Sequence, residues 1–385
     1  MQRFLNALPG PPDYRYDWAA LDGLPGLHSL LADMARTPQN PKWHGEGDVL
    51  THTRLVCEAL CALPAFRELP EKPRQMLAAA ALLHDAGKAK RTRLDADELV
   101  SPGHAASGSR FTRELLWTEY GLSGDVEGRR FRETVCWLIR HHGVPPHLLR
   151  EEEPETHLLR MAADGELLPE ATLRLLCLLA EADALGRVAP DVQDMRDRVL
   201  LCAELAAELG CLDGPYPFAD AHTERALFRG ARVWRDQRLY DDSWGEVIVL
   251  CGLPGTGKDT WAARQHLPQV SLDALRARWP GNVGDEEQGA IAHAARDEAK
   301  EYLRAHRPFI WNATSLTARR ERVIRLCEDY GARVRLVWLE TPWPENLRRN
   351  AARQAAVPEH VICGMLHRLE PPARWEAQTV EWVCV

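Results

Sequence analysis

Val247-Ile-Val-Leu-Cys-Gly-Leu-Pro-Gly-Thr-Gly-Lys-Asp-Thr260 joins an apolar run to a glycine-rich loop. The apolar run predicts a buried strand, and the residues from Lys258 onward predict the start of a helix. Between such a strand and helix, backbone N–H groups cradle phosphate, and a lysine reaches the β- and γ-oxygens of a nucleoside triphosphate. We therefore expect a P-loop that binds ATP, or another NTP or dNTP, together with Mg²⁺.

The loop departs from the usual P-loop sequence at one position. Asp259 stands where Ser or Thr normally holds Mg²⁺, and Thr260 follows it. A carboxylate can bind the metal directly or through water, and Thr260 can also take over this role, so the Mg²⁺ ligand stays open. The expected nucleotide contacts are Gly252, Pro254, Gly255, Thr256, Gly257, Lys258, Asp259 and Thr260, with Arg349 and Arg353 from farther along the chain.

Outward from the loop, strands and helices alternate through the C-terminal part of the chain. We expect strands over 246–251, 308–311 and 333–340, and helices from 257 and over 317–330. This alternation is typical of a parallel sheet with crossover helices. The sequence therefore predicts a C-terminal α/β domain with a P-loop, over residues 245–385.

Phosphoryl transfer to a hydroxyl also needs a group that deprotonates the acceptor and cations that neutralise the developing charge. Asp273 and Arg276, which follow at a second-strand position, offer both. Arg349 and Arg353 are one helical turn apart and should share a helix face, which indicates a lid that closes over the phosphates. Taken alone, Asp273 is also explained as a helix N-cap.

These residues resemble the kinase domain of polynucleotide 5′-hydroxyl kinases, over residues 246–372. The motifs that carry the resemblance are the P-loop, Asp273-x-x-Arg276, Trp311-Asn-Ala-Thr314, and Arg349-Asn-x-x-Arg353 followed by Ala356-Val-Pro358. The resemblance implies that Asp273 is the general base for the 5′-hydroxyl. It also implies that Arg276 contacts the neighbouring phosphate of the strand and that Arg353 is the lid arginine on the donor phosphates. Asn312 stands where many relatives carry Asp, so we assign it no metal role.

The N-terminal half has the spacing of apolar residues that is typical of helices. We expect helices over 50–63, 74–86, 131–139, 172–185 and 194–209. Residues 210–218 are dense in glycine and proline, which indicates a domain boundary. The sequence therefore predicts an all-α domain over 1–212 and a connector over 213–244, with a helix expected over 220–240.

Histidine and aspartate residues on these helices predict a metal centre. His84 and Asp85 are adjacent, while His52 and Asp183 lie on two other apolar helices, where a polar inward side chain needs a partner. The series resembles the HD phosphohydrolase superfamily, an all-α fold that binds divalent metal through these four positions. Mixed histidine and carboxylate ligands suit divalent transition metals, and such centres activate water to attack a phosphoester. Whether His52 or the nearby His44 is the ligand is left open by spacing, and we favour His52.

The resemblance covers residues 43–187 and includes further positions that agree with the phosphatase-like members. These are His44, Lys88, His104, His141 and His142. It implies that Lys88 holds the substrate phosphate, and that His104 and His142 extend the site to a second metal or protonate the leaving oxygen. Spacing does not decide which of His141 and His142 points inward, and we favour His142.

Composition bounds the partners and the location. The 385 residues carry a net charge of −8, which argues against a nonspecific nucleic-acid coat because such a coat needs a basic surface. Local basic channels remain candidates at arginines in 129–132, 319–322 and 348–353, the first two of which we expect on solvated helix faces. The longest strongly apolar run, 76–83, is too short to cross a bilayer, so we expect a cytoplasmic protein with no membrane partner.

An HD-type half and a polynucleotide-kinase-like half in one chain look like the bacterial HD-domain polynucleotide kinases. The resemblance implies a bifunctional enzyme that heals RNA or DNA ends. One half would remove a 2′,3′-cyclic, 2′- or 3′-phosphate, the other would phosphorylate a 5′-hydroxyl, and a ligase would act downstream. A second interpretation is a small-molecule kinase fused to a nucleotide phosphohydrolase, because P-loop kinases of sugars and antibiotics share the loop and lid. A noncatalytic nucleotide sensor is a third, but Lys258, Asp273 and the arginines form a complete phosphoryl-transfer set.

Overall fold

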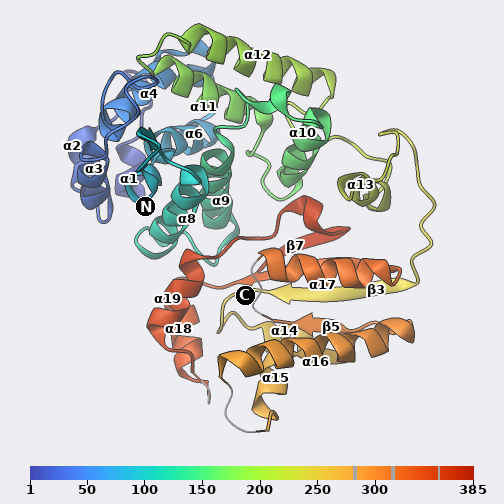
Figure 1. The fold of residues 1–385 in the computed structure, drawn as a ribbon. Coiled ribbons are helices and arrows are strands. Elements are labelled where there is room, and N and C mark those ends of the chain that lie inside the picture. Colours follow the sequence, from blue (N-terminus) through green and yellow to red (C-terminus); the bar gives the residue numbers. More distant parts are fainter. Residues whose placement is uncertain (281–283, 314–316, 354–355) are drawn as a thin grey trace. The chain divides into compact units, whose positions relative to one another are not determined.

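The chain forms two compact units, Met1–Tyr216 and Pro217–Val385. The computed structural model describes residues 1–280, 284–313, 317–353 and 356–385. Figure 1 shows that the first unit is built of helices and the second around a sheet, as the sequence predicts. Among the described residues, we find no helix with the length and apolar character needed to span a membrane.

Unit 1 is a bundle of helices with two short 3₁₀ turns. Its helical elements are α1 (Gln2–Asn6), α2 (Trp18–Asp22), α3 (Leu27–Ala35), α4 (Val49–Ala62), α5 (Pro64–Arg67), α6 (Glu71–Leu83), α7 (Lys88–Arg91), α8 (His104–Thr118), α9 (Val126–His141), η1 (Leu148–Arg150), α10 (Pro154–Ala163), η2 (Asp164–Glu166), α11 (Leu173–Leu185) and α12 (Val192–Glu208). Side-chain caps fix several starts: Asp48 accepts from Thr51 N at 2.9 Å before α4, and Asp125 accepts from Gly128 N at 2.7 Å before α9.

Helix α6 forms the centre of this unit. Every residue of its apolar run, Met76–Leu83, is fully buried, and α6 packs against α4, α9 and α11. An all-round apolar helix of this kind can be stable only inside a core. The residue that follows the run, His84, is therefore carried into the middle of the bundle.

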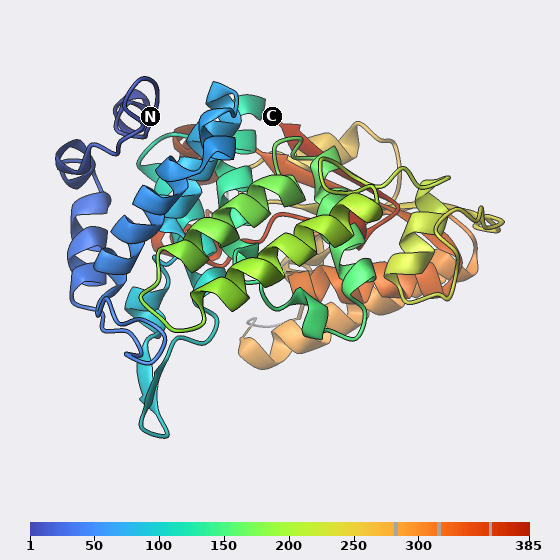
Figure 2. The same ribbon diagram turned by 90° about the horizontal axis from the view of Figure 1, so that it is seen from above.

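A small β-hairpin interrupts the helices and was not predicted from the sequence. Strands β1 (Arg93–Asp95) and β2 (Glu98–Val100) pair antiparallel, with Asp95 opposite Glu98. The two turn residues, Ala96 and Asp97, have φ values of 47° and 66°. Figure 2 shows the hairpin projecting from the helices of unit 1.

Unit 2 is built on a five-stranded sheet of order β4-β5-β3-β6-β7 in which all neighbouring strands are parallel. The strands are β3 (Gly245–Cys251), β4 (Gln269–Ser271), β5 (Ile310–Asn312), β6 (Ala332–Glu340) and β7 (Thr379–Cys384). The helical elements are α13 (Ala221–Phe228), α14 (Lys258–Ala263), α15 (Leu272–Ala277), α16 (Asp285–Arg304), α17 (Thr317–Asp329), α18 (Trp343–Ala351), α19 (Glu359–His367) and η3 (Arg374–Glu376).

The glycine-rich loop leaves the middle strand of this sheet. Strand β3 lies between β5 and β6, and its residues from Val247 to Cys251 are buried. Figures 1 and 2 show α16 and α17 together on one face of the sheet, as right-handed crossovers require. This strand order places the loop at the carboxyl edge of the sheet, where the chain connections change direction. Ligands of open parallel sheets bind at such a point.

Two expectations about helices are wrong. The helix expected over 220–240 ends at Phe228, because Gly230 adopts a left-handed conformation with φ of 90°. The arginine clusters over 129–132 and 319–322 are not purely solvated faces. Arg132 is fully buried and lies 2.7 Å from Glu133, and Arg320 is buried against η3. These arginines stabilise the cores rather than form a nucleic-acid surface.

Candidate active sites

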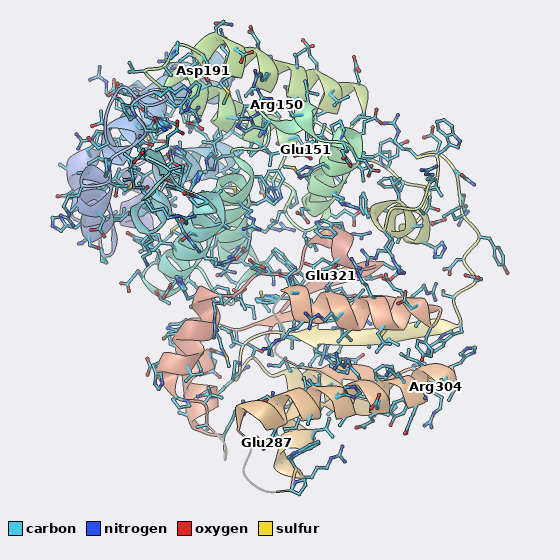
Figure 3. The ribbon with its side chains drawn as sticks, in the orientation of Figure 1. Arg150, Glu151, Asp191, Glu287, Arg304 and Glu321 are labelled. Carbon is cyan, nitrogen blue, oxygen red and sulfur yellow. The ribbon has the colours of Figure 1, made fainter. Side chains whose placement is uncertain are left out.

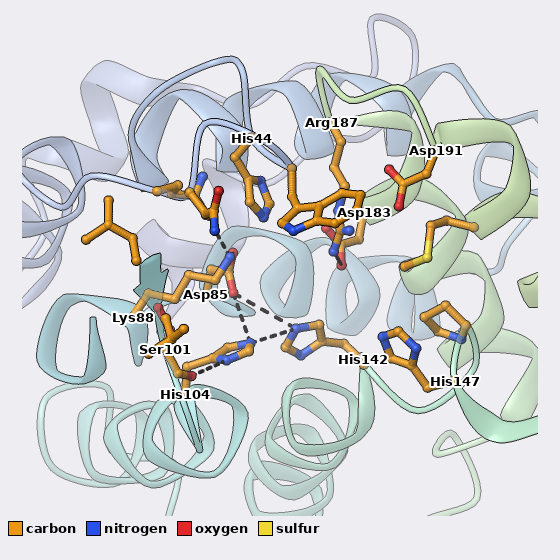
Figure 4. Close-up of a pocket in the computed structure, with 18 of the residues that line it drawn as sticks. His44, Asp85, Lys88, Ser101, His104, His142, His147, Asp183, Arg187 and Asp191 are labelled. Atoms are coloured by element: carbon orange, nitrogen blue, oxygen red, sulfur yellow. Dashed lines mark hydrogen bonds and ion pairs between the residues drawn. The ribbon is translucent and has the colours of Figure 1, made fainter. Parts of the chain in front are cut away.

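The residues of unit 1 that were predicted to bind metal or phosphate lie together, and most of them line one cavity of about 810 Å³. They come from separate elements: His44 from the loop before α4, His52 from α4, His84 and Asp85 from the end of α6, Lys88 from α7, His104 from α8, His142 from the end of α9 and Asp183 from α11. All except His104 are buried, and Figure 4 shows several of them facing the pocket. Helix packing thus brings together residues that are up to 139 positions apart (183 − 44).

Three of the histidines are held in the same way. In each, Nδ1 donates to a backbone carbonyl three residues earlier: His84 to Ala81 O at 2.8 Å, His104 to Ser101 O at 2.9 Å, and His142 to Ile139 O at 2.8 Å. A carbonyl can only accept, so the proton is on Nδ1 and the Nε2 lone pair is free to bind another group. This arrangement fixes both tautomer and ring orientation, as in histidines that ligate metals.

The first group of facing atoms joins α4, α6 and α11. His52 Nε2 lies 3.0 Å from Asp183 Oδ1 and 3.6 Å from Asp85 Oδ2. His84 Nε2 lies 3.3 Å from Asp85 Oδ2 and 4.0 Å from Asp183 Oδ1. Two imidazole nitrogens and two carboxylates therefore converge, which is a ligand set for one divalent ion.

The second group shares Asp85 with the first. Its other oxygen, Oδ1, lies 3.4 Å from His104 Nε2 and 4.0 Å from His142 Nε2, and the two Nε2 atoms are 3.4 Å apart. With both Nδ1 atoms protonated, these are two lone pairs and a carboxylate oxygen facing one another, which only a cation can stabilise. Asp85 Oδ1 and His84 Nε2 are moreover buried without a hydrogen-bond partner of suitable geometry among the described residues. The residues present fit bound metal.

Asp85, Asp183 and His142 have the charge states that metal ligands need. Burial opposes the ionised form of Asp85, but the Lys88 ammonium and His84 hold its pKa well below the ordinary value. Asp183 is likewise buried, and Arg187 and His52 hold its pKa well below its ordinary value. Burial, reinforced by neighbouring histidines, lowers the pKa of His142 to about 4. Charged carboxylates therefore face a neutral imidazole, the forms that bind metal.

Lys88 lies at the open side of this cluster. Its ammonium is 2.7 Å from Asp85 Oδ2 and donates to Gln39 Oε1 at 2.7 Å. The turn before it needs glycine, because a Cβ atom on Gly87 would lie 2.0 Å from the carbonyl oxygen of His104. This close approach packs the turn directly against the start of α8, so that Lys88 and His104 line the same cavity.

Sequence reasoning missed two residues of this site. Glu46 Oε1 lies 2.8 Å from His44 Nδ1 and 2.9 Å from His52 Nδ1, while Oε2 accepts from Val188 N at 2.9 Å. Arg187 Nη2 lies 3.7 Å from Asp183 Oδ2 and lines the cavity. Arg187 is four residues after Asp183, so helical spacing could have revealed it. Nothing in the sequence pairs Glu46 with a helix that starts after it.

The structure separates the histidine pairs that spacing left open. His142 faces Asp85, whereas the ring of His141 packs against Trp137 with ring centroids 5.2 Å apart. His52 contacts both carboxylates, whereas His44 contacts Glu46 and lines the cavity. His44 thus lies next to the cluster and His52 within it.

In unit 2 the glycine-rich loop wraps closely around its own backbone. Gly252 has φ of 147°, and a Cβ there would lie 2.5 Å from Leu339 O, so only glycine fits. Lys258 Nζ folds over the loop and donates to Gly252 O and Leu253 O, each at 2.9 Å. Burial lowers the pKa of Lys258 to about 8. Asn346 of α18, which was not predicted, donates to Pro254 O at 2.8 Å and ties the loop to that helix.

Asp273 lies just after strand β4. It is in the first turn of α15, but the N-cap is Ser271, whose Oγ accepts from Ala274 N at 3.3 Å, so the capping interpretation of Asp273 is wrong. Its oxygens lie 2.5 Å from Arg276 Nη1 and 3.5 Å from Arg353 Nη2. The Asp273 side chain is 66 % exposed, so it borders an open surface.

The two lid arginines do not share a helix face. Helix α18 ends at Ala351, and Arg353 lies beyond it. The reason is Asn350, whose side chain donates to Val357 O at 2.7 Å and accepts from Val357 N at 3.2 Å, closing a loop that carries Arg353. Arg349 remains on the helix, with Nη1 3.6 Å from where a Cβ on Gly257 would be. Arg349 thus lies near Gly257 of the P-loop, and Arg353 lies near Asp273.

The residue after the P-loop lysine has a partner of its own. Asp259 Oδ1 accepts a hydrogen bond from Asn312 Nδ2 at 2.7 Å, so the end of β5 orients this carboxylate. A carboxylate held beside a phosphate-binding loop fits the oxygen ligation that Mg²⁺ prefers. Thr260 is exposed next to it. Thr314, part of the motif that carried the kinase resemblance, lies outside the described residues.

Comparison with known families agrees with this division. Residues 49–187 match the family described as HD domain, and residues 247–372 match a family described as AAA domain. No curated protein is similar enough to the chain to count as a match. The first match covers α4 to α11 with the metal-type cluster, and the second covers the P-loop, Asp273 and Arg353. The chain therefore joins an HD phosphohydrolase domain to a P-loop kinase-like domain.

Proposed function

We propose that this fusion of an HD domain and a P-loop kinase-like domain heals the ends of broken RNA or DNA. The kinase site would transfer the γ-phosphoryl group of ATP to a 5′-hydroxyl. The HD site would remove a 2′,3′-cyclic, 2′- or 3′-phosphate from the other end, so that a ligase could then join the strands. The proposal extends the two domain assignments to a polynucleotide substrate.

One observation supports the polynucleotide acceptor above others: the carboxylate of Asp273 is exposed while it contacts Arg353 and influences Lys258. Arg353 Nη2 lies 3.5 Å from Asp273 Oδ2, and both charges act on the Lys258 ammonium. A base that is 66 % exposed beside the phosphate-binding lysine leaves room for a strand end, which continues beyond the reacting nucleotide. A small-molecule kinase typically encloses most of its acceptor.

In the kinase step, Lys258 would exchange its contacts with Gly252 O and Leu253 O for the β- and γ-oxygens of ATP. Asp273 would accept the proton of the 5′-hydroxyl as that oxygen bonds to the γ-phosphorus and the bond to the β,γ-bridging oxygen breaks. Arg353 would neutralise charge on the transferred group, and Arg276 would hold the next phosphate of the strand. Asp259, oriented by Asn312, is the residue that would hold Mg²⁺, which when bound screens the charge of the phosphates.

In the phosphatase step, His52, His84, Asp85, Asp183, His104 and His142 would hold the metal. Divalent metal lowers the pKa of bound water and shares the charge that develops on a phosphoester. Lys88 would bind a phosphate oxygen, since its ammonium already faces the cavity. We assign His104 and His142 to metal binding rather than to protonation of the leaving oxygen, because their Nε2 atoms face each other and Asp85 Oδ1 at 3.4–4.0 Å. The pKa of His142, lowered to about 4 by burial, also keeps that ring neutral.

The acceptor specificity of the kinase tests this proposal. Protein, Mg²⁺ and ATP labelled in the γ-phosphate are incubated separately with 5′-hydroxyl oligonucleotides, nucleosides and sugars. We expect label on the oligonucleotides, its loss in Asp273→Asn, and its retention in the control Asp297→Asn, which changes a carboxylate on the surface of α16. Label on nucleosides or sugars but never on oligonucleotides would show a small-molecule kinase instead.

A further inference from the structure

The cavity of unit 1 has a second wall, which the proposed phosphate chemistry does not use. Arg150 from η1, Asp191 from the residue before α12 and Arg198 from α12 line it together with His147. Figure 4 shows His147 and Asp191 on the opposite side of the pocket from Lys88, and Figure 3 marks Arg150. A ligand that spans the cavity would therefore touch the metal-type cluster at one end and this wall at the other.

Arg150, Arg187 and Arg198 line the same cavity as His147. Burial, and then the charges of Arg150, Arg187 and Arg198, lower the pKa of His147. Three cations therefore lie within electrostatic reach of one ring, which itself stays neutral near pH 7. Arg198 Nη2 is compensated by Asp194 Oδ2 at 2.5 Å. Arg150 is exposed to the cavity, and within the described part of the chain it forms no ion pair.

Asp191 offers the wall an acceptor. Its Oδ1 is buried and has no hydrogen-bond partner among the residues that the structure describes. The carboxylate lines the cavity and lacks donors among these residues, so a hydroxyl or N–H group of a ligand would be stabilised beside it. The wall thus combines two cationic groups for an anion with one acceptor for a neutral donor.

The size of the cavity agrees with a ligand larger than a single phosphate. Its volume of about 810 Å³ lies in the range of pockets that take whole small molecules, whereas a phosphate held by the metal ligands and Lys88 fills only one end. Guanidinium groups bind phosphate oxygens in bidentate fashion, and carboxylates accept from ribose hydroxyls or base N–H groups. A nucleotide with a phosphate on both sides matches this order of binding groups across the cavity: metal ligands and lysine, then carboxylate, then arginines.

We propose that Arg150, Arg198 and Asp191 form a subsite for the nucleotide that carries the terminal phosphate. The two arginines hold the phosphodiester that links this nucleotide to the rest of the strand, and Asp191 accepts from its ribose or base. This inference rests on the proposed phosphatase function and gives it a substrate class. The HD site distinguishes a strand end from a free mononucleotide because only the strand end has the second phosphate.

A pair of substrates tests the subsite. A dinucleotide and a mononucleoside, each ending in a 2′,3′-cyclic phosphate on the same base, are hydrolysed by the full-length protein in separate reactions with Mn²⁺, Co²⁺ and Ni²⁺. We expect Arg150→Gln to lower kcat/KM for the dinucleotide by about 10- to 100-fold, the value of a charge-assisted hydrogen bond, with little change for the mononucleoside. Arg198→Gln should act in the same way.

The control is Arg196→Gln, on the same helix as Arg198. Arg196 lies 2.8 Å from Glu181 and does not line the cavity, so this variant should hydrolyse both substrates as the wild type does. Arg150 is exposed, so its replacement should leave the fold intact even if Arg198→Gln does not fold. An equal loss on both substrates, or no loss on either, would overturn the subsite while leaving the phosphatase proposal standing. Hydrolysis of neither substrate by the wild type would overturn both.

Discussion

Glu46→Gln should weaken metal binding in unit 1, although Glu46 is not one of the proposed metal ligands. The side chain of Glu46 is 1 % exposed, and its two oxygens face three N–H groups, those of His44, His52 and Val188. A carboxylate can accept from all three, whereas an amide has one accepting oxygen and one donating nitrogen. If the NH₂ group of glutamine takes the place of Oε1, it faces the N–H groups of His44 and His52; if it takes the place of Oε2, it faces Val188 N. Either orientation disrupts the contacts that hold His52, directly or by displacing the side chain that supports it.

The magnitude follows from the role of this carboxylate. Although burial opposes a charged imidazole at His52, hydrogen bonds to Asp183 and Glu46 raise the pKa of His52. The carboxylate at Nδ1 therefore makes the ring more basic and fixes the direction of Nε2. Partners of this kind typically change metal affinity by about 10- to 100-fold, which is about 1.4–2.8 kcal/mol. We expect a loss in that range for Glu46→Gln.

The assay is a competition titration of Mn²⁺ or Co²⁺ between the protein and a coloured chelator, with unfolding of the metal-free proteins measured in parallel. The matched control is Glu151→Gln, because Glu151 Oε2 lies 2.6 Å from His157 Nδ1 on the surface, where no metal-type cluster was found among the described residues. Figure 3 marks Glu151. Equal metal affinity for wild type, Glu46→Gln and Glu151→Gln would refute the reasoning.

Three further outcomes are expected. In a fluorescent-nucleotide titration, ATP should bind about tenfold more weakly at pH 9 than at pH 7, because Lys258, with a pKa of about 8, loses the charge that attracts phosphate. Lys258→Arg should remove this pH dependence. Arg320→Leu should lower the free energy of unfolding of its unit in urea by about 3–5 kcal/mol, because it leaves a buried carboxylate unpaired. The exposed Arg325→Gln should cost less than about 1 kcal/mol. Asn312→Ala should raise the Mg²⁺ concentration needed for half-maximal ATP binding by about tenfold, because Asp259 loses its orienting partner, and an unchanged Mg²⁺ titration would contradict this.

The sequence revealed the fold class and most of the metal-type cluster, because both depend on local patterns. Helical spacing marks α4, α6, α9 and α11, and His52, His84 and Asp183 are polar residues on otherwise apolar helices. Such residues need partners, and packing these helices together supplies them. The prediction of a buried strand before the P-loop worked for the same reason, since an apolar run followed by glycines is a local signal.

The features that the sequence did not reveal depend on contacts that form only in the folded chain. The β1–β2 hairpin turns through Ala96 and Asp97 with positive φ, where Asn-Gly would have been the usual signal, so no pattern announced it. The hairpin nevertheless supplies part of the cavity wall, including Leu99 and Val100. Arg353 was expected one helical turn after Arg349, but the side chain of Asn350 ends that helix through a contact that no spacing rule contains.

The partners that orient functional side chains were also hidden. Asn312 was assigned no metal role because relatives carry Asp there, and its amide instead holds the carboxylate of Asp259. Asn346 ties α18 to the P-loop across 92 positions in the chain. Such contacts pair a polar residue on one element with a backbone or side chain far away in sequence, and composition and periodicity carry no information about them.

The most direct test of the account uses one oligonucleotide that has a 5′-hydroxyl at one end and a 2′,3′-cyclic phosphate at the other. Mass spectrometry follows both ends in the presence of ATP, Mg²⁺ and Mn²⁺. The wild type should add a phosphate to the 5′ end and remove the phosphate from the other, Asp273→Asn should lose only the first change, and Asp85→Asn should lose only the second. An oligonucleotide that the wild type leaves unchanged at both ends, while it phosphorylates free nucleosides or sugars, would contradict the account.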